Sequence, residues 1–405
     1  MTAPAYLHPF AKVAQDAFIS IVGGEGAVVT DADGRRYVDA MASLWYCNVG
    51  HGRGEIVDAV AEQMRELACF HTFERFTNPT ADACAVAISA LAPVPGSRVF
   101  LTSGGSEAVD SALKIARLAH AAAGDPQRQI IISRQPSYHG VTYGGMAATG
   151  LPANQAHFGA MLPGVVQVPK DDLAAVEAVM QANPDQVAAV IAEPVIGAGG
   201  VHPPTEGYLS GLRELCDRHG AWLILDEVIC GFGRLGRWWG AQRFDVCPDL
   251  QTFAKAVTSG YQPLGGVVVA PSVLDALARE PELVLRHGTT YSGHPAACAA
   301  ALAALRITQR EGLLDRADKI GARLSDGLHA QHAAGRVTDV RGDAAVWAVG
   351  LRDGNAVEVR DRMLDHGVIA RPIGTDTIAF SPPLVIEDDQ IDACVDALEA
   401  ALCAT

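Results

Sequence analysis

The sequence predicts an α/β fold, with a mostly parallel sheet in a large domain and a smaller α+β domain built from both ends of the chain. Two observations support this prediction. Through the middle of the chain, short apolar runs bounded by turn residues alternate with amphipathic segments of helix length, which is typical of parallel strands covered by helices on both faces. The flanks show hairpin, short-strand and helix patterns instead. We therefore expect a large domain at residues 55–310 and a discontinuous small domain at residues 1–54 and 311–405.

The expected elements follow in chain order. Residues 26–38 form a hairpin with Asp33 and Gly34 at its turn, because an Asp-Gly pair suits the left-handed turn geometry. Apolar strands are expected at residues 98–102, 129–133, 187–192, 222–225 and 266–270, with helices between them at 106–121, 173–181 and 206–219. After Gly312 we expect a helix, a strand pair near 337–351, a helix near 357–366, short strands around Arg371 and Phe380, and a closing helix from Asp388.

Composition argues against several classes of function. Of the 405 residues, 49% are hydrophobic and 19% charged, enough for a large core. Acidic residues outnumber basic ones 46 to 31, a formal charge of −15 that disfavours nucleic-acid and membrane-surface binding. The chain has no apolar run long enough for a transmembrane helix and no signal-peptide pattern at its start. Nine cysteines without a C-x-x-C pair argue against a disulfide framework, so we expect a soluble, cytoplasmic protein.

The run WLILDEV places two carboxylates, Asp226 and Glu227, directly after an apolar strand. The carboxyl ends of parallel strands are where α/β folds bind their ligands. A strand-end acid can equally cap a turn or pair with an arginine, so this run alone leaves both interpretations open.

Lysine is scarce, with five among the 31 basic residues, and Lys255 in TFAKAVTSGY follows an apolar segment with no acid nearer than Asp249. A desolvated lysine has a lowered pKa and acts as a nucleophilic amine. A structural role for a strand-end lysine stays open. Together with Asp226, Lys255 suggests a carbonyl-bearing cofactor held as a Schiff base, with a carboxylate at a pyridinium nitrogen.

The run FLTSGGSEAVDSALK reads as a strand, a glycine pair and a helix. The backbone N–H groups of Gly105 and Ser106 would point outward at the helix N-terminus, where free donors and the helix dipole favour a phosphate. An ordinary serine-capped helix is the alternative interpretation.

A second glycine motif, GFGRLG, satisfies G-x-G-x-x-G through Gly231, Gly233 and Gly236. A dinucleotide-binding fingerprint needs a helix next, but RWWGAQRFD follows here and the motif lies in mid-chain. We therefore do not expect a nicotinamide cofactor. The nucleophile-elbow, zinc-protease and P-loop signatures are missing from the sequence, and no metal site is predicted.

Seven motifs occur together in a fixed order: SGGSEA, SYHG, AEPVIGAGGV, LILDEVICGFGR, TFAKAVTSGYQPLGG, TTYSGHP and RPIG. In this combination the chain resembles the class III pyridoxal-phosphate aminotransferases, from GAVVTDADGRRYVDAMASLW to SPPL. The resemblance implies a PLP-dependent transferase of fold type I, with a seven-stranded type of sheet, and pyridoxal 5'-phosphate (PLP) as cofactor. It also implies a homodimer with shared active sites, with a tetramer left open.

The resemblance carries roles to individual residues. It implies that Lys255 holds the cofactor and moves the proton, and that Asp226 keeps the pyridine nitrogen protonated. The other residues implied at the cofactor are Gly105, Ser106, Tyr138, His139, Glu193, Val228 and Thr290. Of these, Tyr138 would stack on the ring, His139 would be structural rather than a ligand, and Thr290 would reach the phosphate from the neighbouring subunit.

Within the family, the segments ASLWYCNVGHGR and AKAVTSGYQPLGG most resemble the ω-amino acid:pyruvate and amine transaminase branch. The residues implied to line its apolar substrate pocket are Trp45, Tyr138, Val141 and Ala198, with Arg371 gripping a carboxylate. We expect a ping-pong transfer of an amino group from an ω-amino acid, diamine or amine to a keto acid, with pyruvate preferred. Thr289 departs from the branch, which usually carries an aromatic residue there.

Four alternatives stay open at this point. The diaminopelargonate branch usually has paired tryptophans where this chain has Leu44 and Trp45. GABA- or ornithine-type enzymes would use 2-oxoglutarate, and aminomutase or phospholyase chemistry runs on the same scaffold. A catalytically idle PLP-binding protein is the alternative from another class. Lys255 and Asp226 together argue against it, because a binding module needs neither.

Overall fold

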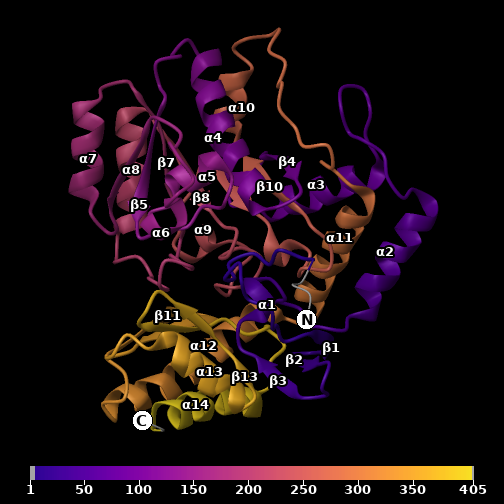
Figure 1. Cartoon of the computed structure of the whole chain (residues 1–405). Helices are drawn as coiled ribbons and strands as arrows, with labels where there is room; N and C mark the ends of the chain where they lie inside the picture. The colour runs from indigo at the N-terminus through magenta and orange to yellow at the C-terminus, as the bar shows by residue number, and fades with distance from the viewer. Residues whose placement is uncertain (1–4, 404–405) are drawn as a thin grey trace.

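The computed structural model describes residues 5–403, and its centre is a seven-stranded sheet in the order β4-β10-β9-β8-β7-β5-β6 (Figure 1). The strands are β4 (Arg98–Thr102), β5 (Ile130–Gln135), β6 (Val165–Pro169), β7 (Val187–Ala192), β8 (Trp222–Asp226), β9 (Leu250–Phe253) and β10 (Gly265–Val269). The strands β5 to β9 are parallel to one another, whereas β10 is antiparallel to both β4 and β9. The predicted α/β class with a mostly parallel sheet is therefore confirmed.

Consecutive residues of the central strands point into two different cores, so both faces of the sheet are covered. In β8, Leu223 and Leu225 belong to the core that includes α7 (Leu173–Ala182) and α8 (Tyr208–His219). Ile224 points the other way, into the core that includes α4 (Gly105–Ala122). All six residues of β7 are buried. Burial on both sides explains why these strands are continuous apolar runs rather than alternating patterns.

Two four-stranded sheets lie beside the large one and take strands from both ends of the chain. The first has the order β1-β2-β3-β13, and the second, which is antiparallel throughout, has the order β11-β12-β15-β14. Their strands are β1 (Ile21–Glu25), β2 (Val28–Asp31), β3 (Arg36–Asp39), β11 (Asp339–Asp343), β12 (Val346–Gly350), β13 (Val368–Ile369), β14 (Arg371–Ile373) and β15 (Thr377–Phe380). The predicted hairpin corresponds to β2 and β3, with Gly34 at positive φ in the turn.

The two chain ends meet in the first of these sheets, where β13 pairs in parallel with β3 and Val368 lies opposite Val38. Helices α12 (Leu313–Ala333), α13 (Ala356–Asp365) and α14 (Asp388–Cys403) pack with these strands around one apolar core. The predicted division into 55–310 and 1–54 with 311–405 stays a prediction, and residues 1–4 and 404–405 lie outside the described part of the chain.

Helix α11 (Pro295–Arg310) contributes to the cores of both parts of the molecule. Cys298 and Ala301 pack in the core of the large sheet, whereas Ala300 and Ala304 pack in the core around α12 and α14. Its small side chains let α2 (Gly54–Glu66) and α3 (Pro79–Leu91) approach closely. The remaining helices are α1 (Ala42–Trp45), α5 (Tyr143–Ala148), α6 (Pro152–Gln155), α9 (Gly240–Arg243), α10 (Pro271–Leu277) and the 3-10 turn η1 (Lys255–Val257).

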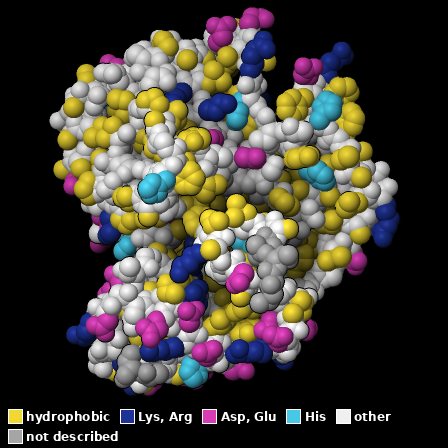
Figure 2. Space-filling view, viewed as in Figure 1, with side chains coloured by type: hydrophobic (Ala, Val, Ile, Leu, Met, Phe, Trp, Pro, Cys, Tyr) yellow, Lys and Arg dark blue, Asp and Glu magenta, His cyan; other side chains and the backbone are white. Residues whose placement is uncertain are grey.

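Side chains of different kinds occupy different parts of the surface. Figure 2 shows acidic and basic side chains gathered over the lower part of this face, around the C-terminal helices, and more hydrophobic side chains above them. Within residues 5–403, no helix combines the length and the apolar character needed to cross a bilayer.

Candidate active site

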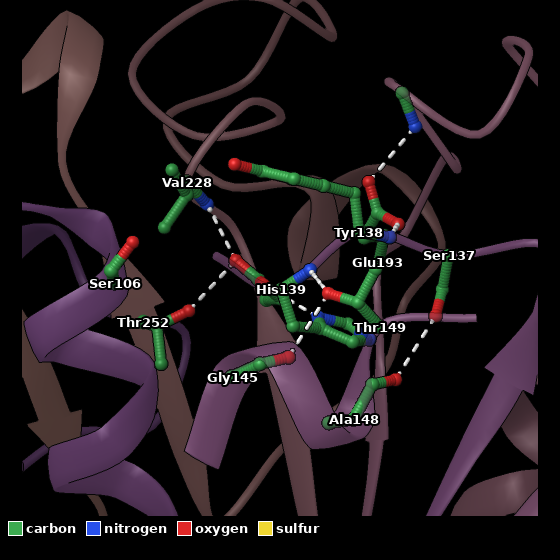
Figure 3. Close-up of polar contacts among 12 residues, drawn as sticks. Ser106, Ser137, Tyr138, His139, Gly145, Ala148, Thr149, Glu193, Val228 and Thr252 are labelled. Carbon is green, nitrogen blue, oxygen red and sulfur yellow. Dashed lines mark hydrogen bonds and ion pairs between the residues drawn. The ribbon is translucent and has the colours of Figure 1, made fainter. Parts of the chain in front are cut away.

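A cavity lies at the carboxyl ends of the parallel strands β5, β7, β8 and β9, the edge at which α/β sheets bind ligands (Figure 3). Segments from four strand ends and the first turn of α4 form its wall. The lining residues are Gly105, Ser106, Val109, Tyr138, His139, Gly140, Glu193, Asp226, Val228, Ile229, Ala254 and Lys255. The structure thus brings together eight of the residues expected at the cofactor, although they are spread over 150 positions of sequence from 105 to 255.

Asp226 ends β8 with its carboxylate buried in the cavity wall. Its Oδ2 lies 2.7 Å from Nδ1 of His139. Its Oδ1 accepts hydrogen bonds from the Thr252 hydroxyl at 2.9 Å and from the Val228 N–H at 3.2 Å. These contacts fix the orientation of the carboxylate, and Nε2 of His139 is left buried without a partner among the described residues.

Lys255 follows β9 and begins η1 with a positive φ of 49°, a conformation that side-chain-bearing residues seldom adopt. Such backbone strain is most often found at functional sites. Burial lowers the pKa of the Lys255 amine, against the carboxylates of Asp226 and Glu193, which raise it. The result is an amine that is more readily neutral than a surface lysine, and therefore a better nucleophile and base.

Glu193 follows β7 and links two segments of the wall. Its Oε1 accepts the Tyr138 N–H at 3.0 Å and its Oε2 accepts the Gly197 N–H at 2.9 Å. The carboxyl is buried, and this burial raises its pKa. Figure 3 shows the Tyr138 side chain reaching from the Glu193 side of the site toward Val228, with His139 beside it. Glu193 therefore holds the backbone at the aromatic wall of the cavity.

The N-terminus of α4 forms the opposite wall and is open to an anion. A Cβ on Gly105 would lie 2.9 Å from Cγ1 of Val228, so only glycine fits there without movement. The Ser106 hydroxyl accepts the Val141 N–H at 3.0 Å, which ties the helix start to the segment after Tyr138. The eighteen residues of α4 aim their dipole and the free N–H groups of the first turn at this end.

Arg371 begins β14 in the second small sheet and is half-buried. Burial lowers the pKa of its guanidinium, while the Tyr138 phenol raises it. The charge of Arg371 in turn lowers the pKa of Lys255, so the two side chains lie within electrostatic reach of each other. The Nε of Arg371 is buried without a partner, and no carboxylate within residues 5–403 pairs with this arginine.

Five predicted residues do not line this cavity, and Arg371 is one of them. Trp45 is buried in an apolar cluster with Ile229, and Ala198 lies half-buried in the loop after β7. The Val141 side chain is 57% exposed, and Thr290 is exposed in the segment between α10 and α11. Thr290 is therefore not part of the cavity wall of its own chain.

Sequence reasoning missed several residues of the site. Thr252 holds Asp226, and its signal was its place in the TFAK run, three residues before Lys255. Ile229, Ala254 and Val109 complete the apolar part of the wall, and no local pattern marks them. Across residues 5–403, no three histidine, cysteine or acidic side chains gather in a way that could hold a metal ion.

The family model described as "Aminotransferase class-III" matches residues 10–402. The chain belongs to the class III aminotransferases. It is 37% identical to an omega-aminotransferase of Caulobacter vibrioides, over 91% of this chain and 90% of that protein. It is 36% identical to a putrescine–pyruvate aminotransferase of Pseudomonas aeruginosa, over 95% of this chain and 92% of that protein.

The fold matches solved structures of this aminotransferase family equally well. A PLP-bound amine transaminase from an uncultivated Pseudomonas species superposes with a TM-score of 0.94 at 36% identity, covering 99% of both chains. The expected PLP-dependent transferase fold of type I is therefore confirmed. This aminotransferase moves an amino group to a keto acid, and its cofactor is pyridoxal phosphate.

The residues of the cavity fit pyridoxal phosphate. An aldehyde needs an amine, and Lys255 is the lysine in the wall; a pyridine nitrogen needs a carboxylate, and Asp226 is buried and oriented there. A phosphate needs free N–H donors, and the start of α4 is kept open by Gly105. Bound PLP supplies an electron sink for the electron pair released when the donor carbon loses its proton.

Proposed function

We propose that this class III aminotransferase takes the amino group of an ω-amino acid, diamine or amine and transfers it to pyruvate. Kinetics of the ping-pong type are expected, because the oxo product of the donor leaves before the keto acid enters. The observation that carries this proposal is the half-buried Arg371, which has no ion-pair partner within residues 5–403, has a buried Nε without a partner, and lies within electrostatic reach of Tyr138 and Lys255.

Each residue of the cavity has a proposed role in the transfer. Lys255 Nζ takes the proton from the donor carbon, which its lowered pKa favours, and later returns a proton to the new amino acid. Asp226 keeps the pyridine nitrogen protonated, and His139 and Thr252 hold the Asp226 carboxylate in place. The residues proposed to hold the phosphate, the ring and its edge are Gly105, Ser106, Tyr138, Glu193 and Val228.

The charges around Lys255 favour pyruvate as the acceptor. They include one cation, Arg371, and two carboxylates, Asp226 and Glu193. A guanidinium binds one carboxylate through two parallel hydrogen bonds. A keto acid with a single carboxylate matches one arginine, whereas a dicarboxylate such as 2-oxoglutarate needs a second cation. The pyruvate-using relative from Pseudomonas aeruginosa supports the same acceptor.

The donor pocket is proposed to continue from the cavity over apolar side chains. Ile229 lies in the cavity wall and packs against Trp45, while Ala198 and Val141 flank the segments that Glu193 and Ser106 tie together. An amine without an α-carboxylate would place its carbon chain on this apolar side. Pyruvate would instead turn its carboxylate toward Arg371.

We propose further that the working unit is a homodimer in which Thr290 completes the site of the neighbouring subunit. Thr290 is exposed, and the surface around it is apolar: Phe70, Phe73, Phe76 and Tyr291 are all more than 40% exposed. The Thr72 hydroxyl donates to the Ser292 carbonyl at 2.9 Å, which joins the segment carrying these phenylalanines to the segment carrying Thr290. Contiguous exposed apolar side chains mark protein interfaces.

A cytoplasmic location stays a prediction.

A donor screen tests the acceptor. The enzyme is given β-alanine, a longer ω-amino acid, a diamine or 1-phenylethylamine, with pyruvate or 2-oxoglutarate as acceptor. We expect alanine with pyruvate and little glutamate with 2-oxoglutarate. Glutamate as the main product would move the assignment to the GABA or ornithine type, and neither product would favour diaminopelargonate or non-transaminase chemistry.

Replacing Arg371 by Ala tests the observation on which the proposal depends. We expect the KM of R371A for pyruvate to rise by about 10²-fold, since a bidentate charged pair is lost, with little change for 1-phenylethylamine. Equal losses for both substrates would show that Arg371 does not bind a carboxylate.

A further inference from the structure

The glycine segment that resembles a dinucleotide motif contains a fully buried arginine, Arg234. Its guanidinium has no carboxylate partner within residues 5–403. Instead it donates to three neutral oxygens: the Ala345 carbonyl at 3.0 Å, the Pro382 carbonyl at 2.7 Å and the Asn48 Oδ1 at 2.5 Å. Burial lowers the pKa of Arg234 to about 10. Burying a charge without an ion-pair partner is costly unless the charge is hydrogen-bonded. The three neutral acceptors supply these hydrogen bonds, and they hold the guanidinium in one fixed orientation.

The three acceptors belong to the small-domain part of the chain, whereas Arg234 follows β8 of the large sheet. Ala345 immediately precedes β12, Pro382 lies two residues after β15, and Asn48 lies three residues after α1. Arg234 and Ala345 share two hydrogen bonds, because the Ala345 N–H also donates to the Arg234 carbonyl at 3.2 Å. One side chain therefore ties the large sheet to both chain ends.

The glycines of the segment allow this close approach. Gly233 has a φ of 105°, which suits glycine alone, and a Cβ there would lie 3.0 Å from Cδ1 of Leu384. The segment folds back on itself, with the Phe232 N–H donating to the Trp238 carbonyl at 2.6 Å. GFGRLG thus forms a tight loop pressed against the C-terminal segment, which accounts for its glycines without a dinucleotide.

Strand β14, which carries Arg371, pairs with β15, and β15 pairs in turn with β12. Arg371 in β14 lies opposite Ala379 in β15, and Ala379 lies opposite Ala348 in β12. Arg234 holds the start of β12 and the end of β15. A shift of these strand ends would move Arg371 relative to Tyr138 and Lys255, which sit on the large sheet.

We propose that Arg234 is a positioning residue for substrate carboxylates, fixing the sheet that carries Arg371 against the cavity of the large domain. A guanidinium suits this role because its five N–H donors lie in a rigid plane and reach several acceptors at once, which a lysine ammonium cannot do in the same geometry. The proposal rests on the proposed carboxylate-binding function of Arg371.

The test compares R234K with R323K, a matched Arg→Lys change at an exposed arginine of α12 that pairs with Asp392. We expect R234K to raise the KM for pyruvate about tenfold, as expected for a slightly displaced binding group, and to leave the KM for 1-phenylethylamine within about twofold. R323K should change neither. NMR titration of the PLP-loaded protein with propionate should show the same weakening without turnover.

A double-mutant cycle with R371A separates the two proposals. Once Arg371 is gone, R234K should add little further loss for pyruvate, because both changes act through the same contact. The inference about Arg234 is overturned if R371A raises the pyruvate KM but R234K does not. It is also overturned if R234K raises the pyruvate KM as much in the R371A background as in the wild type. In both cases the carboxylate-binding function of Arg371 still stands. If R371A leaves the pyruvate KM unchanged, the carboxylate-binding function of Arg371 fails and this inference fails with it.

Should R234K not fold, N48A replaces it, because it removes one acceptor of Arg234 and leaves the two carbonyls. The change also removes the hydrogen bond that Asn48 Nδ2 donates to the Phe232 carbonyl in the same loop. We then expect a pyruvate-specific rise in KM of about threefold, since one of three contacts is lost. An N48A enzyme with an unchanged KM for pyruvate, or with equal losses for both substrates, would overturn the inference.

Discussion

At the scale of single residues, the position of Asp226 depends on parts of the chain that are distant in sequence. His139 and Thr252 contact its two oxygens from positions 87 residues before it and 26 residues after it. A carboxylate held from both sides keeps one orientation without reorganising during the reaction. This preorganisation is what an electrostatic role at a ring nitrogen requires.

Lys255→Ala should abolish amino transfer without unfolding the protein. The alanine removes the amine that moves the proton, so we expect turnover to fall by about 10³-fold or more. Because the change removes a buried amine that is costly to desolvate, we expect no loss of folding stability. Steady-state assays and a thermal melt measure the two effects. Lys319→Ala, at an exposed lysine on α12, serves as the control. Substantial transamination by K255A would contradict the assignment.

The sequence predicts the chemical groups of this site better than their contacts. Lys255 and Asp226 stand out because a scarce lysine and a strand-end acid are local features. The hydrogen bond between His139 and Asp226 is not local, and the resemblance placed His139 at the cofactor without indicating that it contacts Asp226. Likewise, the free Nε of Arg371 follows from what surrounds it after folding, which no pattern in RPIG shows.

At the scale of elements, the N-terminal turn of α4 has two adjacent glycines with different surroundings. A Cβ on Gly105 would meet Val228, whereas a Cβ on Gly104 would have no atom within 4 Å, and Gly104 has an extended φ of −179°. Only Gly105 is therefore required by close packing at the proposed phosphate position.

Gly105→Ala should weaken cofactor binding by about tenfold, because the helix start or Val228 must move away from its position at the phosphate. Gly104→Ala, the matched control, should bind PLP nearly as tightly as the wild type. Titration of the apoenzyme with PLP, followed by absorbance, measures both dissociation constants. A weakening of the same size in both variants would argue against the role of Gly105.

Several strands that the sequence analysis did not predict are short, and their burial depends on tertiary packing. β9 has four residues, LQTF, and its polar Gln251 and Thr252 are buried between β8 and β10. β6 lies at the edge of the sheet, where most of its residues are only partly buried, and in β1 every residue is exposed. Helices α4, α7, α8 and α13 lie within two residues of their predicted bounds, because their apolar residues recur at helical spacing. Helices α2, α3 and α11 are long as well, but the sequence analysis did not predict them.

At the scale of the whole molecule, the exposure of Thr290 predicts how two chains cooperate. In a dimer of K255A with Thr290→Asp, one site has both defects and the other has neither. The aspartate should weaken the site it reaches, since its charge repels a phosphate. Mixing and reassociating the two variants in equal amounts should restore about one quarter of wild-type activity, because half of the dimers carry one intact site. No recovery would mean that Thr290 acts within its own chain.

The stability of the whole chain should depend on an ion pair near the N-terminus. His51 Nε2 lies 2.8 Å from Asp39 Oδ2, and this hydrogen bond raises the pKa of His51 from 6.5 to about 10. A raised histidine pKa stabilises the fold in full below the unfolded value, and the contribution is lost as pH rises through the folded value. The wild type should therefore have a higher Tm than His51→Gln below pH 6.5, and this difference in Tm should disappear between pH 6.5 and 10. Thermal melts of both proteins at several pH values measure it. His329→Gln, at an exposed histidine without a carboxylate partner in the described chain, is the control.

The pairing of β3 with β13 sets an order for synthesis on the ribosome. The strand containing Val38 emerges early, but its partner Val368 is translated only after the whole large sheet has left the tunnel. Domains that fold as they emerge would leave the edge of β3 open in the nascent chain, where an unpaired strand invites contact with other chains. The large sheet can form first, and the N-terminal hairpin gains its last partner near the end of translation. A chaperone that shields residues 36–39 during that interval would protect the growing aminotransferase from aggregation.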